Sequence, residues 1–229
     1  MIDYLNYGKQ VQSIPKEPES KIRSCVPNST HGWLEYKLNK KELNYVWSCV
    51  NDQEFDKENW SHKLAGNISN SYLLEDKNDW FYNTTIIPLI DRYESTFTNL
   101  AKKVPICSKK DNDYPPYVMN TWWVNYQKQC EFNPPHDHHG VYSFVIWLKI
   151  PYDAQEQNKN NASNSKLKGV FSFMYLDMFG VSSSSVYALS KGFEGYMLFF
   201  SSKLNHTVFP YYNCEEDRIS VSGNILLKV

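Results

Sequence analysis

The chain has 229 residues, of which 41% are hydrophobic and 16% aromatic, and its formal net charge is -1. This length supports one substantial core, alone or with a smaller helical lobe, and the near-zero charge provides no general basic field for nucleic acid or an anionic membrane. No stretch reaches the ~18 apolar residues of a membrane span. Five scattered cysteines without a Cys-x-x-Cys pair argue against a disulfide scaffold or a zinc ribbon. The expected compartment is therefore the reducing cytoplasm.

The N-terminal stretch, residues 1–30, is polar, contains three prolines and shows no sustained periodicity, so it is expected to form an irregular arm. A first helix is predicted after it. Asn39 is a good N-cap and Glu42 follows three residues later, which is the pattern of a capping box at the start of a short helix through Val50.

A second helix has the clearest amphipathic pattern in the chain. Its apolar residues recur at three- and four-residue steps, namely at Ile86, Ile90, Tyr93, Phe97, Leu100 and Val104. Pro88 lies near its start, so this helix either begins close to the proline or kinks there. Residues 31–110 are therefore expected to be a helical support region, with a loop near residues 64–68 that lies against another part of the protein.

From Tyr117 onward, β-branched and aromatic runs alternate with turn residues. The expected strands are 118–132, 141–150, 170–176, 185–189, 196–200, 207–212 and 219–229. Short strands following N-terminal helices predict an α+β, mainly β, fold, with a sandwich or jelly-roll core over residues 117–229 that the helices buttress. One domain, residues 1–229, accommodates all of these elements.

A cluster of metal-competent side chains stands at the centre of this β half. It consists of four consecutive residues after two prolines, His136, Asp137, His138 and His139. In an extended segment His136 and His138 share one face, and Asp137 and His139 share the other, so either pair could supply two ligands to one ion. The competing interpretation is a polar turn that enters a strand.

A metal site also needs a ligand from a distant strand, and His206 is the candidate because it follows an apolar strand. Shortly after it, Arg218 and Ser220 share one strand face. A guanidinium on the inner face of a barrel needs an anionic partner, for which a carboxylate is well suited. On the outer face of an edge strand, Arg218 and Ser220 would simply be exposed and would indicate no ligand.

The order His-x-His, a distal His, then Arg-x-Ser resembles the iron- and 2-oxoglutarate-dependent dioxygenases, over roughly Trp122 to Leu227. The last strand, Arg218-Ile219-Ser220-Val221-Ser222-Gly223-Asn224, is similar to that of a hydroxylase-like branch of these enzymes. The resemblance implies a double-stranded β-helix (jelly-roll) fold. It also implies Fe(II), 2-oxoglutarate and O2 as cofactor and co-substrates, with ascorbate as a supporting reductant.

The resemblance also implies roles for individual residues. His136, His138 and His206 would bind the metal, Arg218 would bind the far carboxylate of 2-oxoglutarate, and Ser220 would assist it. Asn125 and Tyr126, on the strand before the ligand pair, match positions that touch the co-substrate. Most of the superfamily has an acid where this chain has His138, so the site would carry one less negative charge.

The expected reaction is hydroxylation of a C–H bond in a protein side chain or small molecule, with release of succinate and CO2. Six aromatic residues could form a dry wall around the reacting atoms: Trp122, Trp123, Phe144, Trp147, Phe199 and Phe209. One alternative is a cupin-like three-histidine metalloenzyme without co-substrate. Another is a non-enzymatic jelly-roll module that binds a sugar or a protein. The sequence does not identify the substrate or the oligomeric state.

Overall fold

The protein is described by a computed structural model, which covers residues 9–12, 22–25, 32–52, 59–97, 117–159, 164–177 and 179–228. Its larger sheet has the strand order β2 (Ile22–Cys25), β3 (Trp33–Lys37), β10 (Tyr196–Ser201), β7 (Tyr142–Lys149), β12 (Arg218–Leu227), β5 (Tyr117–Gln127) and β4 (Asn70–Leu73). The smaller sheet has the order β1 (Lys9–Gln12), β9 (Ser182–Ala188), β8 (Val170–Leu176), β11 (His206–Val208) and β6 (Asn133–His136).

The helical elements are α1 (Lys40–Asn51), α2 (Ile87–Thr96) and α3 (Ala154–Gln157). Short helical turns occur at η1 (Ser61–Lys63), η2 (Lys77–Asp79), the π-helical η3 (Tyr82–Ile86) and η6 (Lys191–Phe193). No helix in the described part of the chain is long and apolar enough to cross a membrane.

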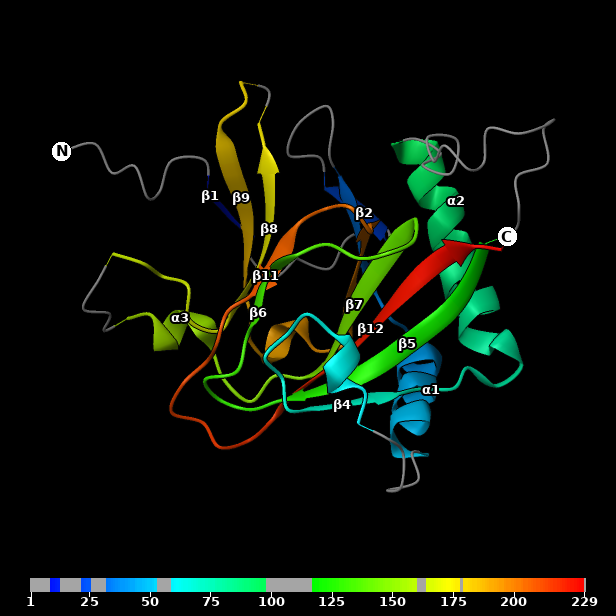
Figure 1. The fold of residues 1–229 in the computed structure, drawn as a ribbon, viewed down its shortest axis with the longest axis horizontal. Helices are drawn as coiled ribbons and strands as arrows, with labels where there is room; N and C mark the ends of the chain where they lie inside the picture. Colours follow the sequence, from blue (N-terminus) through cyan, green and yellow to red (C-terminus); the bar gives the residue numbers. More distant parts are fainter. Residues whose placement is uncertain are drawn as a thin grey trace.

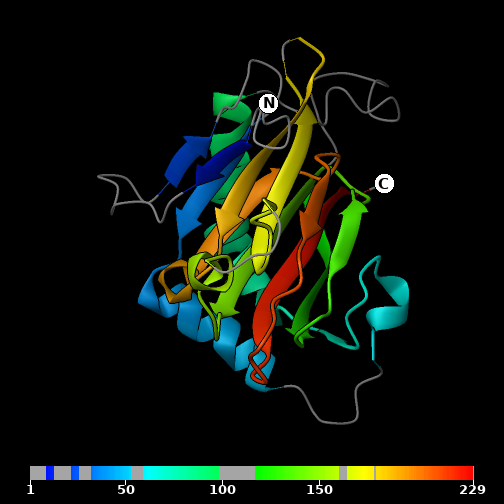
Figure 2. The same ribbon diagram turned by 90° about the vertical axis from the view of Figure 1, so that its left-hand side faces the viewer.

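Three layers follow from how the two faces of the larger sheet are covered. One apolar cluster joins α1 and α2 to this sheet, and a second fills the space between the two sheets. In Figure 1 both helices lie on one side of β7, β12 and β5, and the β8–β9 hairpin lies on the other; Figure 2 shows the same layers after a quarter turn. The mainly β, jelly-roll fold with helical support is therefore confirmed.

The two predicted helices form, each with a recognisable local cause. Asn39 caps α1: its side chain accepts from the backbone N–H of Glu42 at 3.0 Å, and the Glu42 carboxylate accepts from the N–H of Asn39 at 2.7 Å. α2 begins at Ile87 with Pro88 in its first turn, which is the first of the two predicted alternatives, and the π-helical turn η3 directly precedes it. The helix ends at Thr96, and Leu100 and Val104 lie outside the described residues.

The strands β1 to β4 lie where the sequence pattern predicted none. β1 and β2 fall within the stretch 1–30 that was expected to be irregular, and the rest of that stretch is outside the described residues. β3 and β4 fall within the expected helical region. β3 is buried on both faces because helices cover one side of it and the smaller sheet covers the other.

Candidate metal centre and anion pocket

A cavity of about 330 Å³ lies between the two sheets. Its lining on the larger sheet comes from one face of β5 and β12, which pair so that Gln127 is opposite Arg218 and Asn125 is opposite Ser220. On the smaller sheet, β6 and β11 contribute His136 and His206. The segment 63–66 and Ile68 also line the cavity, so the loop expected near residues 64–68 does lie against another part of the protein.

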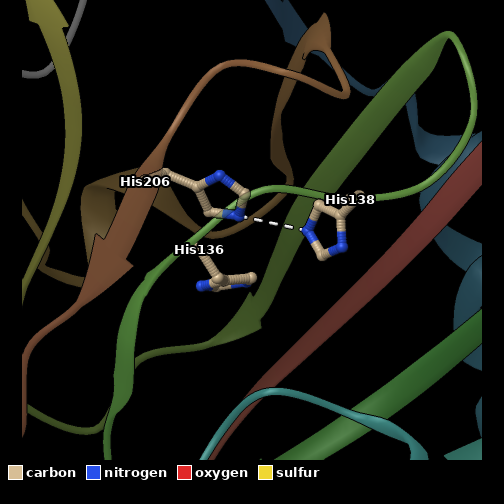
Figure 3. A group of neighbouring side chains, drawn as sticks. All are labelled: His136, His138 and His206. Atoms are coloured by element: carbon tan, nitrogen blue, oxygen red, sulfur yellow. Dashed lines mark hydrogen bonds between the residues drawn. The ribbon is translucent and has the colours of Figure 1, made fainter.

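Three imidazoles converge at this cavity. His136 and His206 are direct partners in the ladder between β6 and β11, and His138 follows two residues after His136. Their ligand atoms all lie within 4.8 Å of one another, and the Nε2 atoms of His138 and His206 are 3.1 Å apart. Figure 3 shows the three rings around a common point. His136 and His138 come from β6 and the loop after it, and His206 comes from β11.

Backbone carbonyls orient two of the rings. The Nδ1 of His136 is 2.7 Å from the carbonyl of Pro134, and the Nδ1 of His206 is 3.0 Å from the carbonyl of Leu204. Because a carbonyl only accepts hydrogen bonds, each Nδ1 carries the proton and each Nε2 keeps its lone pair. Rings held in this tautomer by a backbone partner are typical of metal-bound histidines.

Burial keeps all three rings neutral. It lowers the pKa of His136, it lowers the pKa of His138 to about 4 together with the nearby His136, and it lowers the pKa of His206 well below its usual value. With its proton on Nε2, His138 donates a hydrogen bond to the Nε2 of His206 at 3.1 Å; with its proton on Nδ1, all three rings present an Nε2 lone pair within the same small space. The donor set therefore fits a metal ion, with three nitrogen ligands and no carboxylate.

The alternative pair, Asp137 and His139, does not join this cluster. Both residues are exposed, and the Asp137 carboxylate is 3.3 Å from the ammonium of Lys203. Among the described residues, the ligand atoms that gather belong to His136, His138 and His206. The imidazoles that gather thus come from the His136/His138 face of the segment, while Asp137 and His139 line the same cavity from exposed positions.

Arg218 is the most unusual side chain in the cavity wall, because it is a cation with only 2% of its surface exposed. One guanidinium nitrogen donates to the Tyr152 hydroxyl at 2.6 Å, and another donates to the side-chain oxygen of Gln127. Its Nε has no partner, and no carboxylate in the described part of the chain pairs with it.

A buried cation with only neutral partners is costly, since an unpaired charge in a low-dielectric interior loses its hydration without compensation. An anionic ligand that enters the same cavity would supply the missing charge. Guanidinium binds carboxylates through two parallel hydrogen bonds, which makes a carboxylate a well-matched ligand. The cavity thus combines a metal-competent cluster with an anion-competent pocket.

Of the remaining residues predicted to bind the co-substrate, some line the cavity and one does not. Ser220 and Asn125 line the cavity, and the Oδ1 of Asn125 accepts from the Ser71 hydroxyl at 2.7 Å. Tyr126 does not line it. Because successive side chains of a strand alternate, Tyr126 lies on the opposite face of β5 and packs against the cluster that contains the helices, near Tyr72.

The predicted aromatic wall is divided between the two faces of the larger sheet. Trp123 and Trp147 line the cavity. Phe144 also borders the cavity but packs in the helix-side cluster with Trp122 and Phe199. Phe209 packs against the cluster between the sheets without lining the cavity.

Two residues at this site were not predicted, Gln127 and Tyr152. Gln127 had a readable signal, because it lies two residues after Asn125 and therefore shares its strand face. Tyr152 had none, since it reaches Arg218 from the segment between β7 and α3. Tyr152 also stacks on Tyr211 at a ring-centroid distance of 4.5 Å, and the Tyr211 hydroxyl donates to the carbonyl of Gln127 at 2.6 Å.

Comparison with known proteins agrees with this geometry. Residues 121–224 match the family described as "Putative 2OG-Fe(II) oxygenase", where 2OG is 2-oxoglutarate. The matched segment includes all three histidines, Arg218 and Ser220. A search of curated proteins found no match.

Solved structures share the fold at low sequence identity. A 2OG-Fe(II) oxygenase family oxidoreductase from Burkholderia pseudomallei matches with a TM-score of 0.52 and 11% identity, over 95% of this chain and 94% of that chain. A prolyl hydroxylase from Trichoplax adhaerens, solved with a hypoxia inducible factor peptide fragment, matches with a TM-score of 0.51 and 12% identity, over 86% and 84%.

Proposed function

We propose that the chain, whose residues 121–224 match the family of 2OG-Fe(II) oxygenases, is a 2-oxoglutarate-dependent dioxygenase that hydroxylates a C–H bond. The observation that carries the proposal is the joint presence, in one cavity, of three convergent imidazoles and a buried guanidinium without a carboxylate partner. The family explains why one site needs both features, because it uses a metal ion and a dicarboxylate together.

In this proposal His136, His138 and His206 hold Fe(II) through their Nε2 atoms, and the carbonyls of Pro134 and Leu204 fix two of these rings in the binding tautomer. Bound iron, with 2-oxoglutarate and O2, would supply the oxidative decarboxylation of the co-substrate to succinate and CO2, coupled to conversion of a substrate C–H bond to C–OH.

Arg218 and Ser220 bind the far carboxylate of 2-oxoglutarate. Tyr152 and Gln127 hold the guanidinium in place before the ligand arrives, so little side-chain entropy remains to be lost on binding. Asn125 is a second polar contact for the co-substrate, because Ser71 occupies its oxygen and leaves the amide N–H groups as donors. Trp123 and Trp147 contribute apolar surface that restricts water in the cavity.

One observation favours a second candidate, a three-histidine metalloenzyme that acts without co-substrate: the triad contains no carboxylate. Such an enzyme has no use for a buried guanidinium beside the metal. Binding of 2-oxoglutarate distinguishes the two candidates. A peptide side chain or a small molecule fits either one as the substrate.

The test is formation of succinate from 2-oxoglutarate by the purified protein. We expect turnover that requires Fe(II) and O2, is supported by ascorbate, and is lost in the His206→Ala variant. A slow uncoupled reaction is expected even without the correct substrate, so a panel of peptides and small molecules serves to raise the rate. Succinate formation that persists in His206→Ala, or its absence across the panel at full Fe(II) loading, would contradict the proposal.

A further inference from the structure

His138 differs from the other two imidazoles in how it is held. His136 and His206 lie in paired strands, and their Nδ1 atoms bond to backbone carbonyls. His138 lies beyond the end of β6, in the loop that leads to β7. Within the described residues its Nδ1 has no such carbonyl partner, so the direction of its ring depends on how the loop backbone is fixed.

Two consecutive residues of the turn after β10 fix that backbone from both sides. The N–H of His138 donates to the carbonyl of Ser202 at 2.8 Å, and the ammonium of Lys203 donates to the carbonyl of His138 at 3.0 Å. This turn leads directly into β11, which carries His206. The bonds therefore tie the loop of one imidazole to the turn that precedes another.

Ser202 extends the connection along the loop. It is fully buried, its N–H donates to the carbonyl of Val141 at 3.0 Å, and its hydroxyl donates to the carbonyl of Gly140. On the other side of the loop, the N–H of Val141 donates to the carbonyl of Ile225 in β12 at 2.8 Å. The loop is thus held between this turn and β12.

Gly140 allows this close fit. Its φ is +99°, and a Cβ atom there would lie 2.6 Å from the carbonyl oxygen of Ile225. Any other residue would be strained by the dihedral angle and would displace the loop from β12.

Lys203 has a second contact, at 3.3 Å, with the carboxylate of Asp137. Both side chains are about half exposed, so this ion pair contributes little to stability. Its effect is directional: it holds the Asp137 carboxylate at an exposed position of the cavity wall, apart from the three gathered imidazoles, while the carbonyl contact holds the backbone of His138.

We propose that Ser202 and Lys203 are positioning residues for the metal centre, which direct the His138 ring toward His136 and His206 and hold the Asp137 carboxylate apart from these three rings. This inference rests on the metal site of the proposed function and adds the part of the chain that determines which neighbour serves as the third ligand. Neither residue lines the cavity. The Lys203 ammonium acts on the backbone of His138 directly, and the Ser202 hydroxyl acts on the same loop through the carbonyl of Gly140.

The test measures metal affinity without turnover, by titrating Co(II) into the metal-free protein and following its visible absorption. Ser202→Ala removes the hydroxyl bond to the Gly140 carbonyl and keeps the main-chain bond to His138. We expect it to weaken binding about tenfold, as for other groups that orient metal ligands. We expect Lys203→Met to weaken it about fivefold, because its contacts are more exposed.

Two matched control variants remove the same kinds of side chain at places that do not contact the His138 loop. Ser185→Ala removes a hydroxyl that is equally buried and that bonds to Tyr175 at 2.9 Å in the ladder of β8 and β9. Lys77→Met removes an exposed lysine that pairs with Asp52 at 2.9 Å. Both variants should bind Co(II) as the wild type does.

A double-mutant cycle tests whether the effect passes through His138. In a His138→Ala background, Lys203→Met should change the residual affinity less than about twofold, because its target ring is gone. An effect of undiminished size there would overturn the positioning role. Lys203 is exposed, so this arm is informative even if Ser202→Ala folds poorly.

The outcomes separate the two proposals. A wild-type protein that binds no Co(II) contradicts the metal centre and this inference with it. A wild type that binds Co(II), together with Ser202→Ala and Lys203→Met variants of equal affinity, overturns this inference and leaves the metal centre standing.

Discussion

Replacement of Arg218 by methionine should separate folding from co-substrate binding. The substitution keeps much of the apolar stem and removes a cation that is 2% exposed and has no carboxylate partner. Tyr152 and Gln127 each lose one hydrogen bond, at a cost of about 1 kcal/mol apiece, whereas removal of an unpaired buried charge relieves a penalty of about the same size or larger. The free energy of unfolding of the ligand-free variant should therefore stay within about 2 kcal/mol of the wild type.

Binding of 2-oxoglutarate should respond very differently. Loss of one partner of a buried, hydrogen-bonded charge pair costs about 2–4 kcal/mol, which is a weakening of roughly 30- to 1,000-fold. Isothermal titration calorimetry of the Fe(II)-loaded protein under anaerobic conditions measures this, and urea unfolding of the ligand-free protein measures stability. Arg92→Met, on the exposed side of α2, is the control for loss of a positive charge. Co-substrate affinity within twofold of the wild type in Arg218→Met would refute the reasoning.

Three further predictions concern the rest of the molecule. The metal-free protein should lose stability as the pH falls from 6.5 to 4. Over this range His138 becomes protonated in the unfolded state, but its pKa of about 4 keeps it neutral in the folded state. The free energy of unfolding should therefore fall by on the order of 3 kcal/mol. Urea unfolding at several pH values should show a smaller loss in His138→Asn, and an equal loss would contradict the buried neutral ring. Burial raises the pKa of Cys25 to about 12, so only about one thiol in ten thousand is ionised at pH 8, and iodoacetamide with mass spectrometry should label the exposed Cys130 at least about a hundredfold faster. Asn39→Ala should lower the free energy of unfolding by about 1 kcal/mol through loss of the α1 cap, and an unchanged urea midpoint would argue against the capping box.

The site was readable from the sequence to the extent that alternation along a strand decides which side chains share a face. That rule groups His136 with His138 and Arg218 with Ser220, and these four line one cavity with His206. Applied to β5, the rule allows only one of two adjacent residues to face the cavity. Asn125 does, and Tyr126 does not.

The fold was readable where local signals are strong. The Asn39 cap and the amphipathic stripe around Ile90 predicted helices that form. The sequence left the segment around Pro134 and Pro135 open between an extended metal-binding segment and a polar turn. It forms β6, an edge strand of its sheet, where a residue without an N–H is tolerated. β3 was missed because its membership depends on pairing with the distant β10, which no local pattern encodes.

The contacts that fix the ligands were not readable at all. Ser202 and Lys203 reach His138 across more than sixty positions of sequence, and on the His138 side each contact uses a backbone atom that carries no residue-specific signal. Tyr152 is similarly remote from Arg218. Such contacts arise only once the turn after β10 and the loop after β6 lie side by side.

Anaerobic titration of the protein with Fe(II) and then 2-oxoglutarate tests the central claim most directly. The account predicts one Fe(II) per chain and, on addition of 2-oxoglutarate, a weak visible charge-transfer band, with Fe(II) binding lost in His206→Ala and the band weakened in Arg218→Met. Stoichiometric Fe(II) binding that never yields the band at saturating 2-oxoglutarate, or a band that survives in His206→Ala, would contradict it.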